Sequence, residues 1–152
     1  METKDPSQAH RRLEVFEGTW MGEETLHPSP WDPVGGAATG RLESRMGLDG
    51  FFLITDYVEE RGGRVRYRGH GVYGWDPREQ LYTMHWYDSM GSKVSAKGSW
   101  EGEVLTYSQR SETGHARYVY TPQDSGRYHF RIEVSQDGHA WASVMEATYR
   151  KT

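Results

Sequence analysis

Residues 127–135, near the C-terminal end of the chain, read RYHFRIEVS and have the clearest periodic pattern of the sequence. Their apolar members, from Tyr128 to Val134, stand at every second position and alternate with polar or charged residues. Successive side chains of a strand point to opposite faces, so this period of two predicts a β-strand with one buried face and one face in water.

Similar runs recur along the chain and are separated by turn signals such as Asp49-Gly50, Gly62-Gly63 and Asp137-Gly138. The pattern predicts ten strands, at residues 19–27, 37–47, 51–60, 65–75, 80–88, 93–100, 103–109, 115–121, 127–135 and 140–150. Antiparallel strands without a second helical layer must close or stack to cover their edges. We therefore expect an all-β fold, an up-and-down antiparallel barrel of about ten strands, with a two-sheet sandwich as the alternative.

The N-terminal part of the chain predicts one short helix. Residues 1–12 are polar and charged and contain no apolar export segment. Residues 7–17 predict the helix, in which Ser7 is the N-cap and Leu13 and Phe16 share a face. The chain has the length of a single domain, and we assign residues 1–152 to one barrel.

Composition excludes several classes of function. The chain has no cysteine, which rules out disulfides, thiolate metal sites and a cysteine nucleophile. Its formal charge is −4 and it has no basic run, so no nucleic-acid partner is expected. No window approaches the roughly 18 consecutive apolar residues of a membrane helix, so no membrane partner is expected either. These features predict a cytoplasmic protein and leave its oligomeric state open, a homodimer included.

The start of the first strand resembles that of the calycin barrels, the lipocalins and their relatives. The segment Gly18-Thr19-Trp20 follows the predicted helix directly. The resemblance implies that the Trp20 indole lies across the closed end of the barrel. It also implies that Arg150, in the last strand, packs over that ring.

A second resemblance covers nearly the whole chain. Residues 13–20, 47–53, 69–76 and 86–89 resemble the bacterial family known as domain of unknown function 1579. That resemblance supports the barrel. It implies no particular activity, because the family itself is uncharacterised.

Alternation also predicts which side chains face the barrel interior. If Trp20 points inward, Glu24 does so too, because both stand at the same parity. Other strands contribute an aromatic face that would line the same interior, made of Tyr67, Tyr73, Tyr118, Tyr120, Tyr128 and Phe130. Apolar walls with few polar groups are typical of a ligand pocket. We therefore expect the barrel to bind a small apolar or aromatic ligand.

The histidines give no metal signature, because none forms a His-x-His or His-x-x-x-His pair, and no metal site is expected. His85, between Met84 and Trp86 in a strand without a polar face, is predicted to point inward. Some ten-stranded barrels similar to nitrobindin hold haem through one histidine in the C-terminal part of the barrel. The last strand here has no histidine, so we expect no cofactor, and haem binding is a less favoured alternative.

Two further functions stay open beside ligand binding. Desolvation would raise the pKa of an interior Glu24, which with Tyr67 or Tyr118 could form an acid–base site without a cofactor. Some calycin-like barrels, similar to phenolic acid decarboxylases, work through interior Tyr, Arg and Glu. The other possibility is a structural barrel whose interior is filled by its own side chains.

Overall fold

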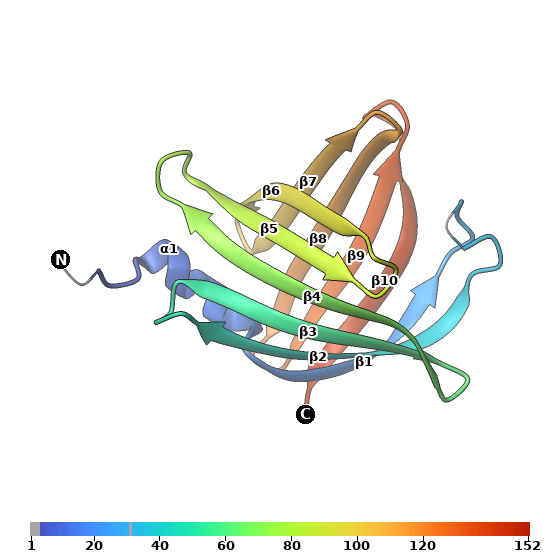
Figure 1. Cartoon of the computed structure of the whole chain (residues 1–152), viewed down its shortest axis with the longest axis horizontal. Helices are drawn as coiled ribbons and strands as arrows, with labels where there is room; N and C mark the ends of the chain where they lie inside the picture. The colour runs from blue at the N-terminus through green and yellow to red at the C-terminus, as the bar shows by residue number, and fades with distance from the viewer. Residues whose placement is uncertain (1–3, 31) are drawn as a thin grey trace.

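The computed structural model describes residues 4–30 and 32–152, which form one closed barrel of ten antiparallel strands (Figure 1). Each strand pairs with the next in chain order, and β1 pairs with β10 to close the ring. The strands are β1 (Gly18–Leu26), β2 (Gly36–Gly47), β3 (Phe52–Arg61), β4 (Arg64–Asp76), β5 (Leu81–Asp88), β6 (Lys93–Glu101), β7 (Val104–Ser111), β8 (Gly114–Asp124), β9 (Arg127–Ser135) and β10 (Ala142–Lys151). The predicted barrel is confirmed, and the predicted strand ends differ from these by no more than three residues.

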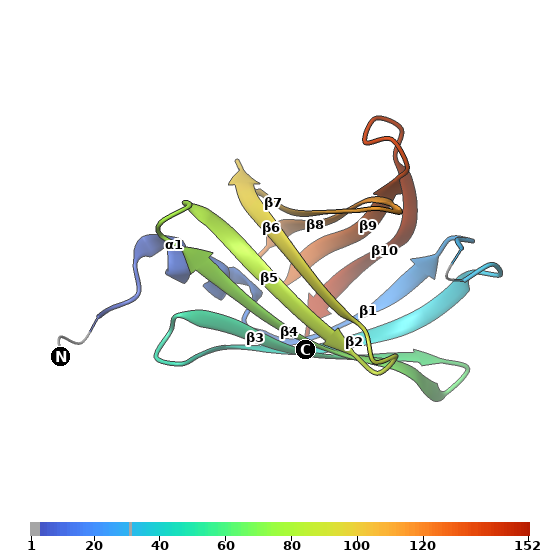
Figure 2. The ribbon, with the colours of Figure 1, turned by 45° about the horizontal axis from the view of Figure 1, so that its top comes forward.

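The predicted helix is present but changes type along its length. An α-helix, α1 (Gln8–Arg11), continues as a 3₁₀ turn, η1 (Arg12–Phe16). Leu13 and Phe16 are buried and fill one end of the barrel, against which the helix lies in Figure 2. Within the described residues no helix is long and apolar enough to cross a membrane. Residues 1–3 of the predicted polar segment lie outside the described part.

Trp20 lies inside the closed end of the barrel, as expected from the Gly18-Thr19-Trp20 segment. Its indole is 1% exposed, its Nε1 donates to the Phe16 carbonyl at 2.9 Å, and its ring meets Tyr128 edge-on at 4.8 Å. Aromatic pairs favour this arrangement. The indole is thereby fixed to both the 3₁₀ turn and the β9 wall.

The expected cation over Trp20 is a different residue. Arg150 is exposed, and Lys151 Nζ lies 5.3 Å from the centroid of the indole. The β1–β10 register pairs Trp20 with Lys151 and Arg150 with Met21. Because Tyr149 points inward, its neighbour Arg150 faces solvent, so the prediction for Arg150 is wrong.

The far end of the barrel differs from the helical end. Antiparallel connectivity places the β1–β2 loop, described over residues 27–30 and 32–35, and the β3–β4 and β5–β6 turns opposite the helix. In Figure 1 the helix lies at the left and the β1–β2 loop at the right. Side chains near these connections surround the cavity described next.

Candidate functional site

The barrel encloses a cavity of about 330 Å³ in the half that lies away from the helix. Toward the helix, the space among Leu13, Phe16 and their neighbours shrinks to about 20 Å³. The larger volume falls within the range of small-molecule pockets. The interior is therefore solid at one end and hollow at the other.

Aromatic side chains form a large part of the cavity wall. All six aromatic residues predicted to face the interior line this cavity: Tyr67, Tyr73, Tyr118, Tyr120, Tyr128 and Phe130. Their inward position follows from strand parity. Their contact with a ligand stays a prediction.

His85 does not point inward. It is exposed, and its Nδ1 lies 3.1 Å from the Ser95 hydroxyl on the neighbouring strand β6. Met84 and Trp86 take the inward positions of β5 and line the cavity. The prediction for His85 is wrong because β5 carries large side chains on both faces, so its alternation did not show which face was inward.

The Trp86 indole lies against β4, where two glycines leave the space that it occupies. A Cβ at Gly69 would overlap the indole, and a Cβ at Gly71 would stand 2.9 Å from it. The indole Nε1 donates to the Tyr67 hydroxyl at 2.8 Å, and that hydroxyl donates to Asp88 Oδ2 at 3.1 Å. These glycines thus make room for an aromatic wall whose polar edge ends on a carboxylate.

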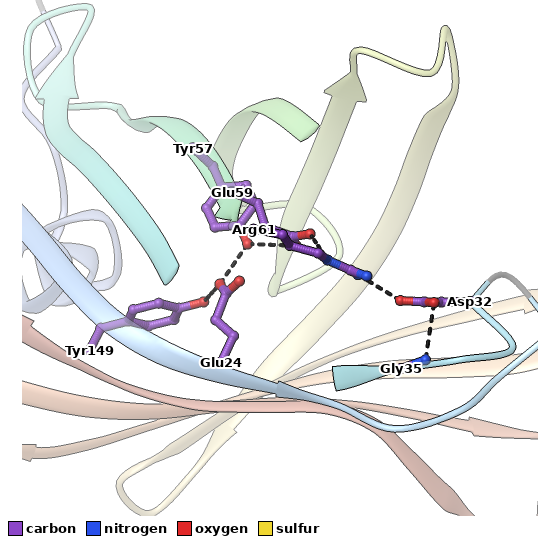
Figure 3. A network of polar contacts seen from close by, with 7 residues as sticks. All are labelled: Glu24, Asp32, Gly35, Tyr57, Glu59, Arg61 and Tyr149. Carbon is purple, nitrogen blue, oxygen red and sulfur yellow. Dashed lines mark hydrogen bonds and ion pairs between the residues drawn. The ribbon is translucent and has the colours of Figure 1, made fainter. Parts of the chain in front are cut away.

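Glu24 faces the interior of the barrel, as its parity with Trp20 predicted, and it is 1% exposed. Its Oε2 accepts hydrogen bonds from the hydroxyls of Tyr57 and Tyr149, each at 2.5 Å (Figure 3). The Tyr57 hydroxyl also lies 3.2 Å from Glu59 Oε2, so the two carboxyl groups share its single hydrogen. Tyr57, Tyr149 and Glu59 line the cavity, so the Glu24 carboxyl group lies behind this wall.

The partners of Glu24 are not those expected from the sequence. Tyr67 and Tyr118 line the cavity but do not bond Glu24, whereas Tyr57 on β3 and Tyr149 on β10 do. Both residues stand at inward positions in the alternation of their strands, so the sequence indicated that they face the interior. Choosing them required the register around the barrel, which places β10 beside β1.

Burial controls the ionisation of Glu24. Desolvation raises its pKa from 4.5 to about 7, and the nearby Glu59 carboxylate adds to this. The hydrogen bonds from Tyr149 and Tyr57, and the Arg61 charge, act in the opposite direction. Glu24 Oε1 is buried with no hydrogen-bond partner in the described residues. The carboxyl group therefore exchanges its proton near neutral pH.

The two tyrosines remain protonated donors under the same conditions. Burial raises the pKa of Tyr57 and of Tyr149 well above 10, and the adjacent Glu24 charge raises both further. Gly40 on β2 gives this cluster its room, because a Cβ there would overlap Oε2 and stand 2.8 Å from Cδ of Glu24. A buried carboxyl group with two fixed donors can store and release a proton.

An ion-paired arginine joins this cluster to the rim. Arg61 Nη2 donates to Asp32 Oδ2 at 2.6 Å, and Arg61 Nε donates to Glu59 Oε1 at 3.2 Å (Figure 3). Asp32 Oδ1 accepts from the Gly35 amide at 3.1 Å. The Arg61 and Gly35 hydrogen bonds hold the pKa of Asp32 below its usual range. The β1–β2 loop is thus fastened to the end of β3.

Potential cofactor ligands are sparse on the cavity wall. Across residues 4–30 and 32–152, no group of three His, Cys, Asp or Glu side chains is arranged to hold a metal ion. His27 is the histidine of the cavity lining, at the rim, with Nε2 3.8 Å from Glu146 Oε2. No lining histidine in the described part stands deep in the wall as an axial haem ligand would, so haem gains no support from these residues.

The fold and cavity define a class, a closed ten-stranded antiparallel barrel with a hollow, aromatic-lined half. Within that class, the chain belongs to the family described as "Protein of unknown function (DUF1579)", which matches residues 5–151. The barrel is similar to the crystal structure of Rv2717c from M. tuberculosis, with a TM-score of 0.74 and 13% sequence identity. That similarity covers 97% of this chain and 99% of the other and concerns the fold alone. None of the curated proteins matches the sequence.

Proposed function

We propose that the protein binds a small molecule with an aromatic or apolar body in the cavity of its barrel. The observation that carries the proposal is the contrast between the two halves of the interior. Around Leu13 and Phe16 the side chains leave about 20 Å³, whereas the other half leaves about 330 Å³. An unused space of that size would forfeit dispersion contacts along its whole wall. A barrel with a purely structural role gains nothing from such a space.

Titration with a neutral fluorescent probe, N-phenyl-1-naphthylamine, tests this proposal. Binding should raise the probe fluorescence and quench tryptophan emission, because Trp86 lies in the wall. Ile132→Phe adds volume inside the cavity and should weaken probe binding by about tenfold or more. His129→Phe is the matched control, since His129 lies on the same strand but at the opposite parity and contacts Thr148. Equal probe binding by both variants, or none by the wild-type protein, would refute the proposal.

A second candidate is proton-transfer catalysis without a cofactor. It is favoured by the Glu24 carboxyl group, whose pKa is near 7 and which accepts hydrogen bonds from Tyr57 and Tyr149. General acid–base catalysis is most efficient when the pKa lies near the working pH. Because Glu24 lies behind the wall, a tyrosine hydroxyl would contact the substrate. Its oxygen would take the substrate proton while its own hydrogen passes to the ionised Glu24 carboxylate.

Solvent deuterium exchange into a neutral aromatic ketone, phenylacetone, measures this chemistry by NMR. The enzyme candidate predicts accelerated exchange that is lost in Glu24→Gln, while the fluorescent probe still binds. Glu23→Gln is the control, because Glu23 is the adjacent residue on the opposite face and contacts Thr39. Exchange no faster than in buffer would remove carbonyl enolisation from the candidates and leave ligand binding.

A further inference from the structure

The charged groups of the cavity wall are out of balance. The described lining contains the carboxylates of Asp32, Glu59 and Asp88 and one guanidinium, Arg61, which gives a formal charge of −2. Glu24 behind the wall adds negative charge when it is ionised. Arg61 is bound by Asp32 and Glu59, so its charge is already matched. Asp88 has no cationic partner in the described part of the chain, and its Oδ1 accepts the backbone amides of Met90 and Ser92, each at 3.0 Å. The cavity therefore favours positive charge.

The hydrogen-bonding groups of the wall show a matching bias. Four donors are already engaged with acceptors of the protein: the hydroxyls of Tyr57, Tyr149 and Tyr67 and the indole of Trp86. A tyrosine hydroxyl has a single hydrogen to donate. A carboxylate has about four lone-pair sites, and Glu59 on the wall uses them for Arg61 and the shared Tyr57 hydroxyl only, so it can accept further hydrogen bonds. A ligand that brings its own donors would suit this wall.

Four further tyrosines line the cavity. Tyr73 and Tyr120 share one hydrogen bond at 3.1 Å between their hydroxyls, which leaves one hydroxyl hydrogen of the pair free. The other two hydroxyls belong to Tyr118 and Tyr128. Neither has a hydrogen-bond partner in the described part of the chain, and both residues line the cavity. A tyrosine hydroxyl accepts as well as donates. These two groups can thus receive a donor from the ligand and do not reverse the bias.

Aromatic rings stand beside the excess carboxylates. The Tyr57 ring lies 5.9 Å from that of Tyr67 and 6.0 Å from that of Trp86, centroid to centroid. Tyr57 hydrogen-bonds to Glu59, and Tyr67 to Asp88. The face of an aromatic ring attracts a cation, more strongly when water is excluded. Rings and carboxylates thus favour the same kind of ligand.

We infer that the ligand of the cavity is a small organic cation, an amine carried as its ammonium form on an aromatic or alkyl body. The inference rests on the proposed binding function and narrows it to a ligand class. The ammonium group would lie near Glu59 and Asp88, against the faces of Tyr57, Tyr67 and Trp86. The apolar body would fill the remaining space between β8, β9 and β10, where Phe130, Ile132 and Val144 form the wall.

Three compounds of similar size and different charge test the inference: 2-phenylethylammonium, 2-phenylethanol and 3-phenylpropanoate. Each is titrated at pH 7.5 against the protein loaded with N-phenyl-1-naphthylamine, and displacement gives its affinity. We expect the cation to bind about tenfold or more tightly than the alcohol, and the anion to bind most weakly. The preference should shrink at high salt.

Variants locate the preference on the wall. Glu59→Gln and Asp88→Asn each remove one negative charge and should reduce the cation-to-alcohol ratio several-fold, while the alcohol affinity changes little. Glu60→Gln is the matched control, because it neutralises the next residue of β3 on the opposite face and should leave the ratio unchanged. Binding of the neutral probe to each variant shows that the cavity is intact.

The possible failures are distinguishable. If the probe and all three compounds fail to bind, the binding function itself falls. If the compounds bind with similar affinities, or the anion binds best, the cation inference is overturned and ligand binding stands. If both Glu59→Gln and Asp88→Asn keep the wild-type ratio, the cation is not recognised by this wall and the inference is also overturned.

Discussion

The hydroxyl of Tyr149 donates a hydrogen bond to Oε2 of Glu24, 125 residues earlier in the chain, at 2.5 Å. The bond crosses the line where β10 meets β1 and the barrel closes. One buried carboxyl group is thus part of both the closure of the barrel and the polar side of its cavity. The stability of the fold and the chemistry of the cavity should therefore respond together to the ionisation of Glu24.

The first prediction concerns pH. The pKa of Glu24 is raised in the folded state to about 7 from its ordinary value of 4.5. Between these two values the unfolded chain releases a proton that the folded protein keeps, so the free energy of unfolding should fall as pH rises. The loss attributable to Glu24 is on the order of 3 kcal/mol. This pKa already includes the effects of the groups that face Glu24, which are Tyr57, Tyr149, Glu59 and Arg61.

Urea unfolding of the wild type, Glu24→Gln and Glu23→Gln between pH 4.5 and 8 measures this effect. Glu24→Gln keeps the shape of the protonated carboxyl group, so it should remove this part of the pH dependence and be more stable than the wild type at pH 8. Glu23→Gln should follow the wild type. Parallel curves for the wild type and Glu24→Gln would show that Glu24 ionises normally.

The second prediction concerns the closed end. Trp20→Ala should lower the free energy of unfolding by about 3–5 kcal/mol, because the ring is fully buried among packed neighbours. Lys151→Ala should cost less than about 1 kcal/mol, the size of an exposed cation–π contact. Arg150→Ala should change nothing measurable. Thermal and urea unfolding of the three variants would check this ranking, and a larger loss for Arg150→Ala than for Lys151→Ala would contradict it.

The third prediction concerns the backbone beneath Glu24. Gly40→Ala places a Cβ where Glu24 Oε2 lies, so the carboxyl group must move away from Tyr57 and Tyr149. We expect a loss of about 2–4 kcal/mol, since buried polar groups would lose their partners. Gly126→Ala is the control, because its Cβ would meet Asp124 Oδ1 at an ordinary 3.7 Å. Equal melting temperatures for the two variants would count against the described position of Glu24.

The fourth prediction concerns the rim. Asp32→Asn removes the ion pair with Arg61, whose partners are about 30% exposed, and leaves the Arg61–Glu59 pair in place, so the global stability should change by less than about 1 kcal/mol. The β1–β2 loop should nevertheless open more often. Hydrogen exchange followed by mass spectrometry should show faster exchange in residues 27–35 and unchanged exchange in β8 and β9. Unchanged exchange in the loop would mean that the loop is held by other contacts.

Much of the fold was readable from the sequence because strands and turns are local features. The alternation at Tyr128 to Val134 and turn signals such as Asp137-Gly138 located the strands to within three residues. Where a strand has large side chains on both faces, as around His85, alternation does not show which face is inward. The prediction that His85 points inward was therefore wrong. The prediction that Arg150 packs over Trp20 was wrong for a related reason. A shift of one residue along a strand moves a side chain to the other face, and Lys151 holds that position.

The site was only partly predictable, since its partners come from distant strands. Parity alone placed Glu24 inside the barrel and aligned the aromatic residues that line the cavity. Tyr57 and Tyr149 could not be selected, because their contact with Glu24 depends on the register of β3 and β10 around the ring. The rim pair of Arg61 and Asp32 depends on the path of a loop, which has no periodic signal.

The order of the strands also has a consequence for how the chain reaches its folded state. Every neighbouring pair in the barrel is joined by a short connection except β1 and β10, which must meet across nearly the whole sequence. Until β10 is available, a growing sheet of nine strands exposes two unpaired edges, the feature that promotes association between chains. The slow step of folding should therefore be the final closure. A chain that stops before Ala142 should aggregate rather than fold.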